Sequence, residues 1–277
     1  RYNMSGPLGS SQYMYSSGAG GFYSHQIEHS ARFDRDDNSR LTRTFGTPTS
    51  DQTFTLSFWL KRGQSCEEID GETGDAMIVI CKANGVDGSG AAIYFSNFRT
   101  NFIEVLDLYG FGVNSGNTMT TANSFRDYSA FNHFVFRYDT TQSTDSDRQR
   151  IYLNGNQLDI SGGTHPNQNS NLSRFNDASA HTIGSAGAGN NSFDGYMAEI
   201  VFTDGQSYAP TQFGETKNGV WVPKDPSGST FGNNGFHLKF INASDLGEDF
   251  SGNDNDFTAS GFGTDHQVKD SPTFTAP

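Results

Sequence analysis

Residues 52–62 read QTFTLSFWLKR, and apolar side chains recur at every second position of this stretch. The apolar set is Phe54, Leu56, Phe58 and Leu60. Side chains two residues apart point to the same face of a β-strand, so these four share one face. The stretch therefore predicts a strand with one buried face, and it places Trp59 on the opposite face.

The same two-residue period recurs at residues 133–139, 194–204 and 236–240. Within residues 194–204 it predicts one face made of Tyr196, Ala198, Ile200 and Phe202. Shorter strand-like runs lie at residues 30–34, 39–45, 76–82, 91–96 and 102–109. No long segment of the sequence has the 3.6-residue period of an amphipathic helix. Recurrent short strands with turn residues between them are typical of a β-sandwich or a β-barrel.

Residues 151–158 read IYLNGNQL, with Asn154 and Gly155 between two strand-like runs. The two central residues of a type I′ turn need positive φ angles, which Asn and Gly tolerate best. This segment is the strongest hairpin signal in the chain.

The composition agrees with an all-β chain and limits its partners. Hydrophobic residues make up 33 % of the 277 residues, but 24 are Phe and 32 are Gly, a mixture that argues against a helical bundle. The formal net charge of −13 disfavours nucleic-acid binding, because an acidic surface repels phosphates. No stretch approaches the roughly 20 apolar residues of a membrane span, so none is expected.

The sequence predicts that the chain has two structural parts. Residues 1–24 are rich in Ser, Gly and Tyr without a period, and we expect a flexible N-terminal arm. Residues 25–277 are expected to form one sandwich with a C-terminal extension. Cys66 and Cys81 permit either one disulfide or two free thiols.

Several segments, in this order between residues 30 and 273, together resemble concanavalin A-like, laminin-G-like modules of phage structural proteins, especially those of marine phages. The resemblance is carried by SARFDRDDNSRLTRTF, FTLSFWLKRG, IYLNGNQL, HTIGS, FDGYMAEIVFTDGQSYAPTQFGE, GVWVPKDPSG, NGFHLKF, DFSGNDNDFTASGF and VKDSPT. It implies an all-β jelly-roll sandwich of two antiparallel sheets. It also implies a place on the surface of a virion, as a tail fibre, head fibre or capsid decoration, with other virion proteins as partners.

One carboxylate motif is the candidate catalytic site of the chain. Residues 68–72 read EIDGE, and laminarinase-type glucanases of similar fold carry a Glu-x-Asp-x-Glu strand, which would make Glu68, Asp70 and Glu72 catalytic. The surrounding GQSCEEIDGETGD is rich in glycine, which weakens strands, so the motif is expected to lie in a loop. We therefore expect a protein that is not an enzyme.

An acidic tract at residues 245–256 is the candidate metal site. Hard cations such as Ca²⁺ prefer the oxygen ligands that Asp249, Asn253 and Asp254 would supply. The alternative is an Asx-rich turn that hydrogen-bonds its own backbone, and it is the commoner outcome for such a tract.

A glycan site would need an exposed aromatic platform, for which Trp59 and Trp221 are eligible. Trp59 lies within a predicted strand, and Trp221 is expected to anchor its segment to the sandwich, so no glycan residue is assigned. The leading hypothesis is a non-enzymatic, oligomeric virion structural protein used for decoration or for host attachment, with host-cell glycans as the candidate ligands of the latter. The alternatives are a secreted or surface lectin and a laminarinase-type glucanase.

Overall fold

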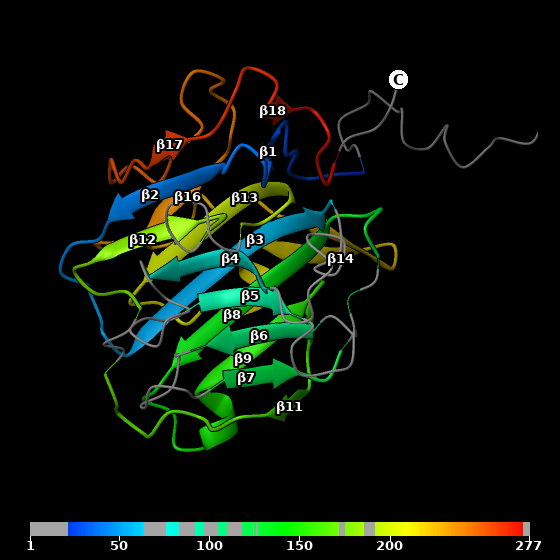
Figure 1. Cartoon of the computed structure of the whole chain (residues 1–277). Coiled ribbons are helices and arrows are strands. Elements are labelled where there is room, and N and C mark those ends of the chain that lie inside the picture. Colours follow the sequence, from blue (N-terminus) through cyan, green and yellow to red (C-terminus); the bar gives the residue numbers. More distant parts are fainter. Residues whose placement is uncertain are drawn as a thin grey trace, which may run out of the picture.

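The computed structural model describes residues 22–63, 76–82, 92–96, 105–109, 118–123, 125, 127–171, 175–185 and 192–273. Two large sheets lie face to face (Figure 1). All strand pairings among the described residues are antiparallel. The prediction of a two-sheet antiparallel jelly-roll sandwich is confirmed.

The first sheet, sheet A, contains eight strands. Its order is β10 (Asn156–Gln157), β9 (Gln149–Leu153), β8 (Asn132–Asp139), β3 (Thr53–Arg62), β13 (Gly195–Asp204), β1 (Ser30–Phe33) and β18 (Gln267–Val268), and β16 (Phe236–Leu238) also pairs with β13. The longest strands, β3 and β13, lie side by side at its centre.

The opposing sheet, sheet B, also contains eight strands. Its order is β11 (Ile160–Gly162), β7 (Thr118–Thr121), β6 (Val105–Tyr109), β5 (Ala92–Ser96), β4 (Ala76–Lys82), β12 (Ala180–Ile183), β2 (Arg40–Thr44) and β17 (Thr258–Ser260). A separate hairpin joins β14 (Gly214–Lys217) to β15 (Val220–Pro223). The described residues also hold two single-turn 3-10 helices, η2 (Asp145–Asp147) and η3 (Pro210–Gln212).

Aromatic side chains fill the space between the two sheets. The four apolar side chains predicted to share a face of β3 all belong to this core. Phe54 stacks on Tyr138 of β8 with 5.2 Å between ring centroids, and Phe202 of β13 stacks on Phe236 at 5.6 Å. Pairs at this spacing contribute about 0.5–1.5 kcal/mol beyond the burial of their area.

The opposite face of β3 is buried too, so the prediction of one buried face is wrong. Thr55, Ser57 and Trp59 are no more than 4 % exposed. Residues 205–231 fold back over the outer side of sheet A, where their aromatic side chains pack on those of the sheet. Ser and Thr are mostly exposed in folded proteins, so the alternation of β3 alone indicates a solvated outer face and gives no sign of this covering segment.

The predicted face of residues 194–204 is wrong for its first half. The register of β13 against β3 shifts between Ala198 and Val201, and Glu199 has a φ of 48°. This β-bulge inserts one residue and reverses the alternation. Met197 therefore joins the core with Ile200 and Phe202, while Ala198 packs on the outer side.

The Asn-Gly hairpin is confirmed. Asn154 has a φ of 47° and Gly155 a φ of 81°, and Leu153 pairs with Asn156 across the turn. A side chain on Gly155 would collide with the ring of Trp221, which lies directly against the turn. The turn thus also makes room for the β14–β15 hairpin.

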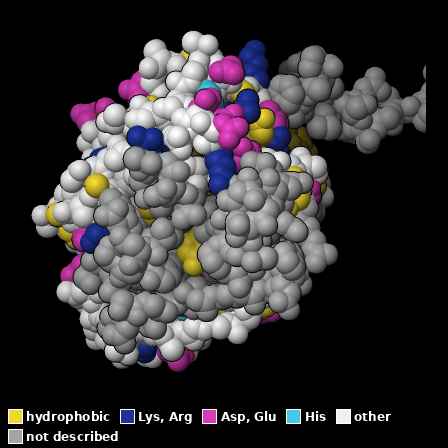
Figure 2. Space-filling model, viewed as in Figure 1, with side chains coloured by type: hydrophobic (Ala, Val, Ile, Leu, Met, Phe, Trp, Pro, Cys, Tyr) yellow, Lys and Arg dark blue, Asp and Glu magenta, His cyan; other side chains and the backbone are white. Residues whose placement is uncertain are grey.

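Several predictions fall outside the described residues. Residues 1–21 of the predicted arm are among them, as are Cys66 and residues 68–72, so the arm and its boundary stay predictions. Cys81 is buried in β4. Among the described residues no helix is long and apolar enough to cross a membrane. On the face seen in Figure 2, acidic and basic side chains lie together along the upper edge, so that edge carries mixed charge.

Candidate functional site

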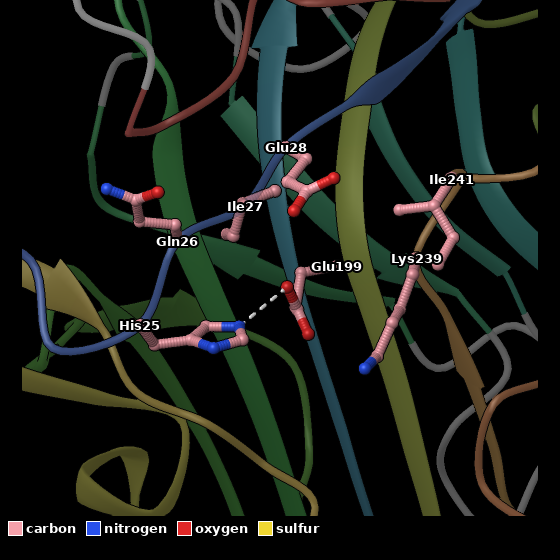
Figure 3. Close-up of a pocket in the computed structure, with 7 residues that line it drawn as sticks. All are labelled: His25, Gln26, Ile27, Glu28, Glu199, Lys239 and Ile241. Atoms are coloured by element: carbon pink, nitrogen blue, oxygen red, sulfur yellow. Dashed lines mark hydrogen bonds and ion pairs between the residues drawn. The ribbon is translucent and has the colours of Figure 1, made fainter.

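A cavity of about 120 Å³ opens on the outer side of sheet A (Figure 3). Residues 22–29, here called the N-terminal segment, form one wall with the consecutive residues from His25 to Glu28. Strand β13 contributes Glu199, and the chain that follows β16 contributes Lys239 and Ile241. The cavity thus combines charged residues with two isoleucines, the mixture found in ligand sites.

Glu199 reaches the cavity because of the bulge in β13. A φ of 48° is uncommon for a residue other than glycine and costs of order 1 kcal/mol or more. The carboxylate is held between two histidines: His25 Nε2 donates to Oε2 at 3.0 Å, and Nε2 of the buried His237 donates to Oε1. These two charge-assisted bonds offset the cost of burying an anion at a strained position.

The two histidines also fix the charge of the site. Burial raises the pKa of Glu199, but the hydrogen bonds from His237 and His25 outweigh it and lower that pKa to about 2. Burial lowers the pKa of His25, while the hydrogen bond and the charge of Glu199 raise it, with a net increase above 6.5. The site therefore holds an ionised carboxylate next to an imidazole that titrates above its usual range.

His237 connects the cavity to the predicted calcium tract. Its backbone N–H donates to Asp249 Oδ1 at 2.7 Å. Asp249 accepts three further hydrogen bonds, from the backbone and hydroxyl of Ser251 and the backbone of Asn255. Asn253 donates its amide to two backbone carbonyls, and Asp254 is exposed. A cation at Asp249 would have to displace these donors, and the calcium site stays a prediction.

A second group has metal-ligand composition. Among the described residues, Asp34, Asp37 and His266 place their ligand atoms within 4.8 Å of one another. Gly263 donates its N–H to His266 Nδ1 at 2.6 Å, so the neutral ring carries its proton on Nε2. Nε2 lies 3.5 Å from Asp37 Oδ2 without a hydrogen bond to it, and a ring nitrogen that carries the proton does not ligate a metal. We therefore assign no metal to this group.

The two tryptophans pack within the structure and form no open platform. Trp59 is 4 % exposed and stacks on His133 at 4.7 Å. Trp221 donates its indole N–H to His133 Nδ1 at 3.0 Å, as expected of an anchor for the β14–β15 hairpin. With Nδ1 accepting, Nε2 of the neutral ring must donate to Ser57 Oγ, and burial lowers the pKa of His133 to about 3. His133 is therefore no base for Ser57.

Sequence reasoning did not find the His25–Glu199–His237 cluster. Glu199 interrupts an otherwise apolar run in β13, and a charge in such a run needs a buried partner. This isolated charge was the signal in the sequence that could have indicated the cluster. The carboxylates of the glucanase alternative, Glu68, Asp70 and Glu72, lie outside the described residues.

Comparison with solved structures finds several proteins of similar fold. A SAP-like pentraxin from Limulus polyphemus is 13 % identical over 68 % of this chain and 82 % of its own, with a TM-score of 0.45. Domain 4 of a GH43 extracellular arabinanase from Geobacillus stearothermophilus, in complex with arabinotriose, is 14 % identical over 61 % of this chain and 68 % of its own, with a TM-score of 0.39. Tailspike protein 2 of an Escherichia coli O157:H7 bacteriophage is 9 % identical over 66 % of this chain and 25 % of its own, with a TM-score of 0.39. No curated protein matches.

A protein-family model described as the concanavalin A-like lectin/glucanases superfamily matches residues 34–206. This match corrects the expectation that the chain is not an enzyme, because the superfamily includes glucanases as well as lectins. Because the matched residues make up more than half of the sequence, the chain belongs to the concanavalin A-like lectin/glucanase superfamily.

Proposed function

We propose that this chain is a carbohydrate-binding module of a phage virion and that the cavity at His25, Glu199 and Lys239 is its glycan site. The main observation in support is that one cavity is lined by an ionised carboxylate, a lysine and two isoleucines. Sugars present hydroxyl groups beside apolar C–H faces, so they need both kinds of partner. A cavity of about 120 Å³ is below the usual range for drug-sized ligands and suits one sugar unit or the end of a chain.

Membership of a superfamily that includes lectins supports the carbohydrate part of this proposal. The ordered sequence segments that resemble phage structural modules support the virion part. We expect a homo-oligomer, because particle components repeat one subunit under closed symmetry. Host attachment at the particle surface would then use several weak glycan sites at once.

Lys239→Ala is expected to weaken glycan binding about tenfold to a hundredfold. Lys239 lines the cavity, and losing a hydrogen bond from a charged group costs about 1.5–3 kcal/mol. A glycan array with the full chain would identify a ligand, and isothermal titration calorimetry would compare the two proteins. Lys82→Ala is the matched control. Lys82 lies on sheet B and pairs with Asp177, so this variant should bind the glycan as the unmodified chain does. Equal affinity for the unmodified chain and Lys239→Ala would refute this site, and an array without any binder would refute the function.

The virion placement predicts that peptides of this chain occur in purified particles of the phage that encodes it. Mass spectrometry of gradient-purified particles would detect them at a repeated copy number. Labelling with an antibody against the chain should then mark the particle surface in electron micrographs. Particles that are infectious but contain none of these peptides would contradict the placement.

A further inference from the structure

The N-terminal segment crosses the outer side of sheet A without belonging to either sheet. Ile27 packs beside Trp59 and Ala198, and its backbone N–H donates to Thr273 Oγ1 at 2.9 Å. Ser24 donates its hydroxyl to Glu215 Oε1 at 2.6 Å. Between these two anchors stands His25, whose ring is bonded to Glu199 (Figure 3). Between its two anchors the segment is therefore also held by a contact whose donor is a histidine.

We propose that the His25–Glu199 contact is a pH-dependent latch that holds the N-terminal segment against sheet A more firmly at acidic than at alkaline pH. The His25 side chain is 16 % exposed, so solvent protons reach the ring without unfolding of the sandwich. Its partner is fixed from the other side, because Glu199 is also bonded to His237 and sits in the bulge. Changes at His25 therefore move the segment and leave the strand in place.

The groups around the latch decide the direction of the effect. Burial lowers the pKa of His25, Glu199 of β13 and Asp225, which follows β15, raise it with a net increase, and Lys239, which follows β16, lowers it slightly. His237 faces the second oxygen of Glu199, and Glu28 on the same segment is exposed. With Glu199 ionised down to a pH of about 2, His25 is the group of this pair that changes charge in the neutral range.

The direction of the pH effect on the His25–Glu199 contact follows from the raised pKa of His25. The stability that a charged His25 adds is complete below pH 6.5, the pKa of an unattached His25. It is lost as the pH rises through the higher pKa of the attached state. A neutral ring still donates to Glu199, but the charge-assisted part of the bond is gone. The segment should thus open more often at pH 8.5 than at pH 6.

Residues 25–28 form one wall of the cavity, so opening of the segment would also remove that wall. This consequence rests on the proposed glycan function, whereas the latch itself does not. If the latch and the glycan site both exist, a glycan binds more tightly at pH 6 than at pH 8.5.

Amide hydrogen exchange of the full chain tests the latch, with protection factors corrected for the intrinsic pH dependence of exchange. We expect protection of the N-terminal segment to fall about threefold to tenfold between pH 6 and pH 8.5, and protection of β3 to stay constant. His25→Gln keeps a donor to Glu199 without a titratable charge, so this fall should disappear. Glu215→Gln, which alters the anchor at Ser24 instead, should retain it.

Unchanged protection of the segment in the unmodified chain, or the same fall in His25→Gln, would overturn the latch. Constant β3 protection in both variants confirms that they fold. Calorimetry at the two pH values separates the two proposals. A segment that opens while no glycan binds would leave the latch standing and refute the glycan site, and pH-independent glycan affinity would refute the link between them.

Discussion

Asp204→Ala is expected to lower the free energy of unfolding by about 3–5 kcal/mol. Asp204 ends β13 and is 0 % exposed. Its carboxylate accepts hydrogen bonds from the backbone N–H groups of Thr49, Ser50 and Asn234 and from the side-chain amide of Asn176. The alanine variant leaves these donors without their shared acceptor, and each buried unsatisfied donor costs about 1–3 kcal/mol. Urea denaturation followed by fluorescence measures the difference.

Two variants separate this effect from a general loss of charge. Asp204→Asn keeps the shape but turns an amide donor towards groups that also donate, so we expect an intermediate loss. Asp159→Ala removes an exposed carboxylate and should change the free energy of unfolding by less than about 0.5 kcal/mol. A loss at Asp204→Ala no larger than that of Asp159→Ala would contradict the role of this buried network.

Glu199→Ala is expected to lower the free energy of unfolding by about 2–4 kcal/mol and to abolish glycan binding. The substitution leaves the buried His237 and the half-buried His25 without their shared acceptor, and each buried donor left unsatisfied costs about 1–3 kcal/mol. It also takes away the carboxylate at the base of the cavity. Urea denaturation and calorimetry with the array-selected glycan measure the two effects.

The pH dependence of this loss has a defined sign. The pKa of Glu199 is lowered to about 2, so its stabilisation is present above the unfolded value of 4.5 and is lost as the pH falls towards 2. The gap between the unmodified chain and Glu199→Ala should therefore be smaller at pH 3 than at pH 6. Glu199→Gly removes the same charge and relieves the strain of the positive φ, so it should be more stable than Glu199→Ala. A gap that grows in acid would contradict the assignment.

The sandwich could be predicted from the sequence because its signals are local. The strand signal of β3 and the turn at Asn154 and Gly155 depend on neighbours in the chain, and the structure confirms the strand and the turn. The covering of sheet A by residues 205–231 depends on tertiary contacts, and nothing in the alternation of β3 indicates it. The bulge has no sequence signature either, since Glu is not a residue that favours positive φ.

The candidate site was harder to predict than the fold. His25 and His237 lie far apart in the sequence and meet only because the N-terminal segment and β16 both reach Glu199. Sequence reasoning considered clusters of carboxylates close together in the chain instead. Of these, Asp249 accepts hydrogen bonds from nearby protein groups, and Glu68 lies outside the described residues.

The glycan site is tested most directly by a crystal structure of the full chain with the array-selected glycan at saturating concentration. We predict that a sugar unit occupies the cavity between the N-terminal segment and Lys239, within hydrogen-bond distance of the charged groups at its wall. Sugar density elsewhere on the molecule, with this cavity filled only by water, would contradict the account.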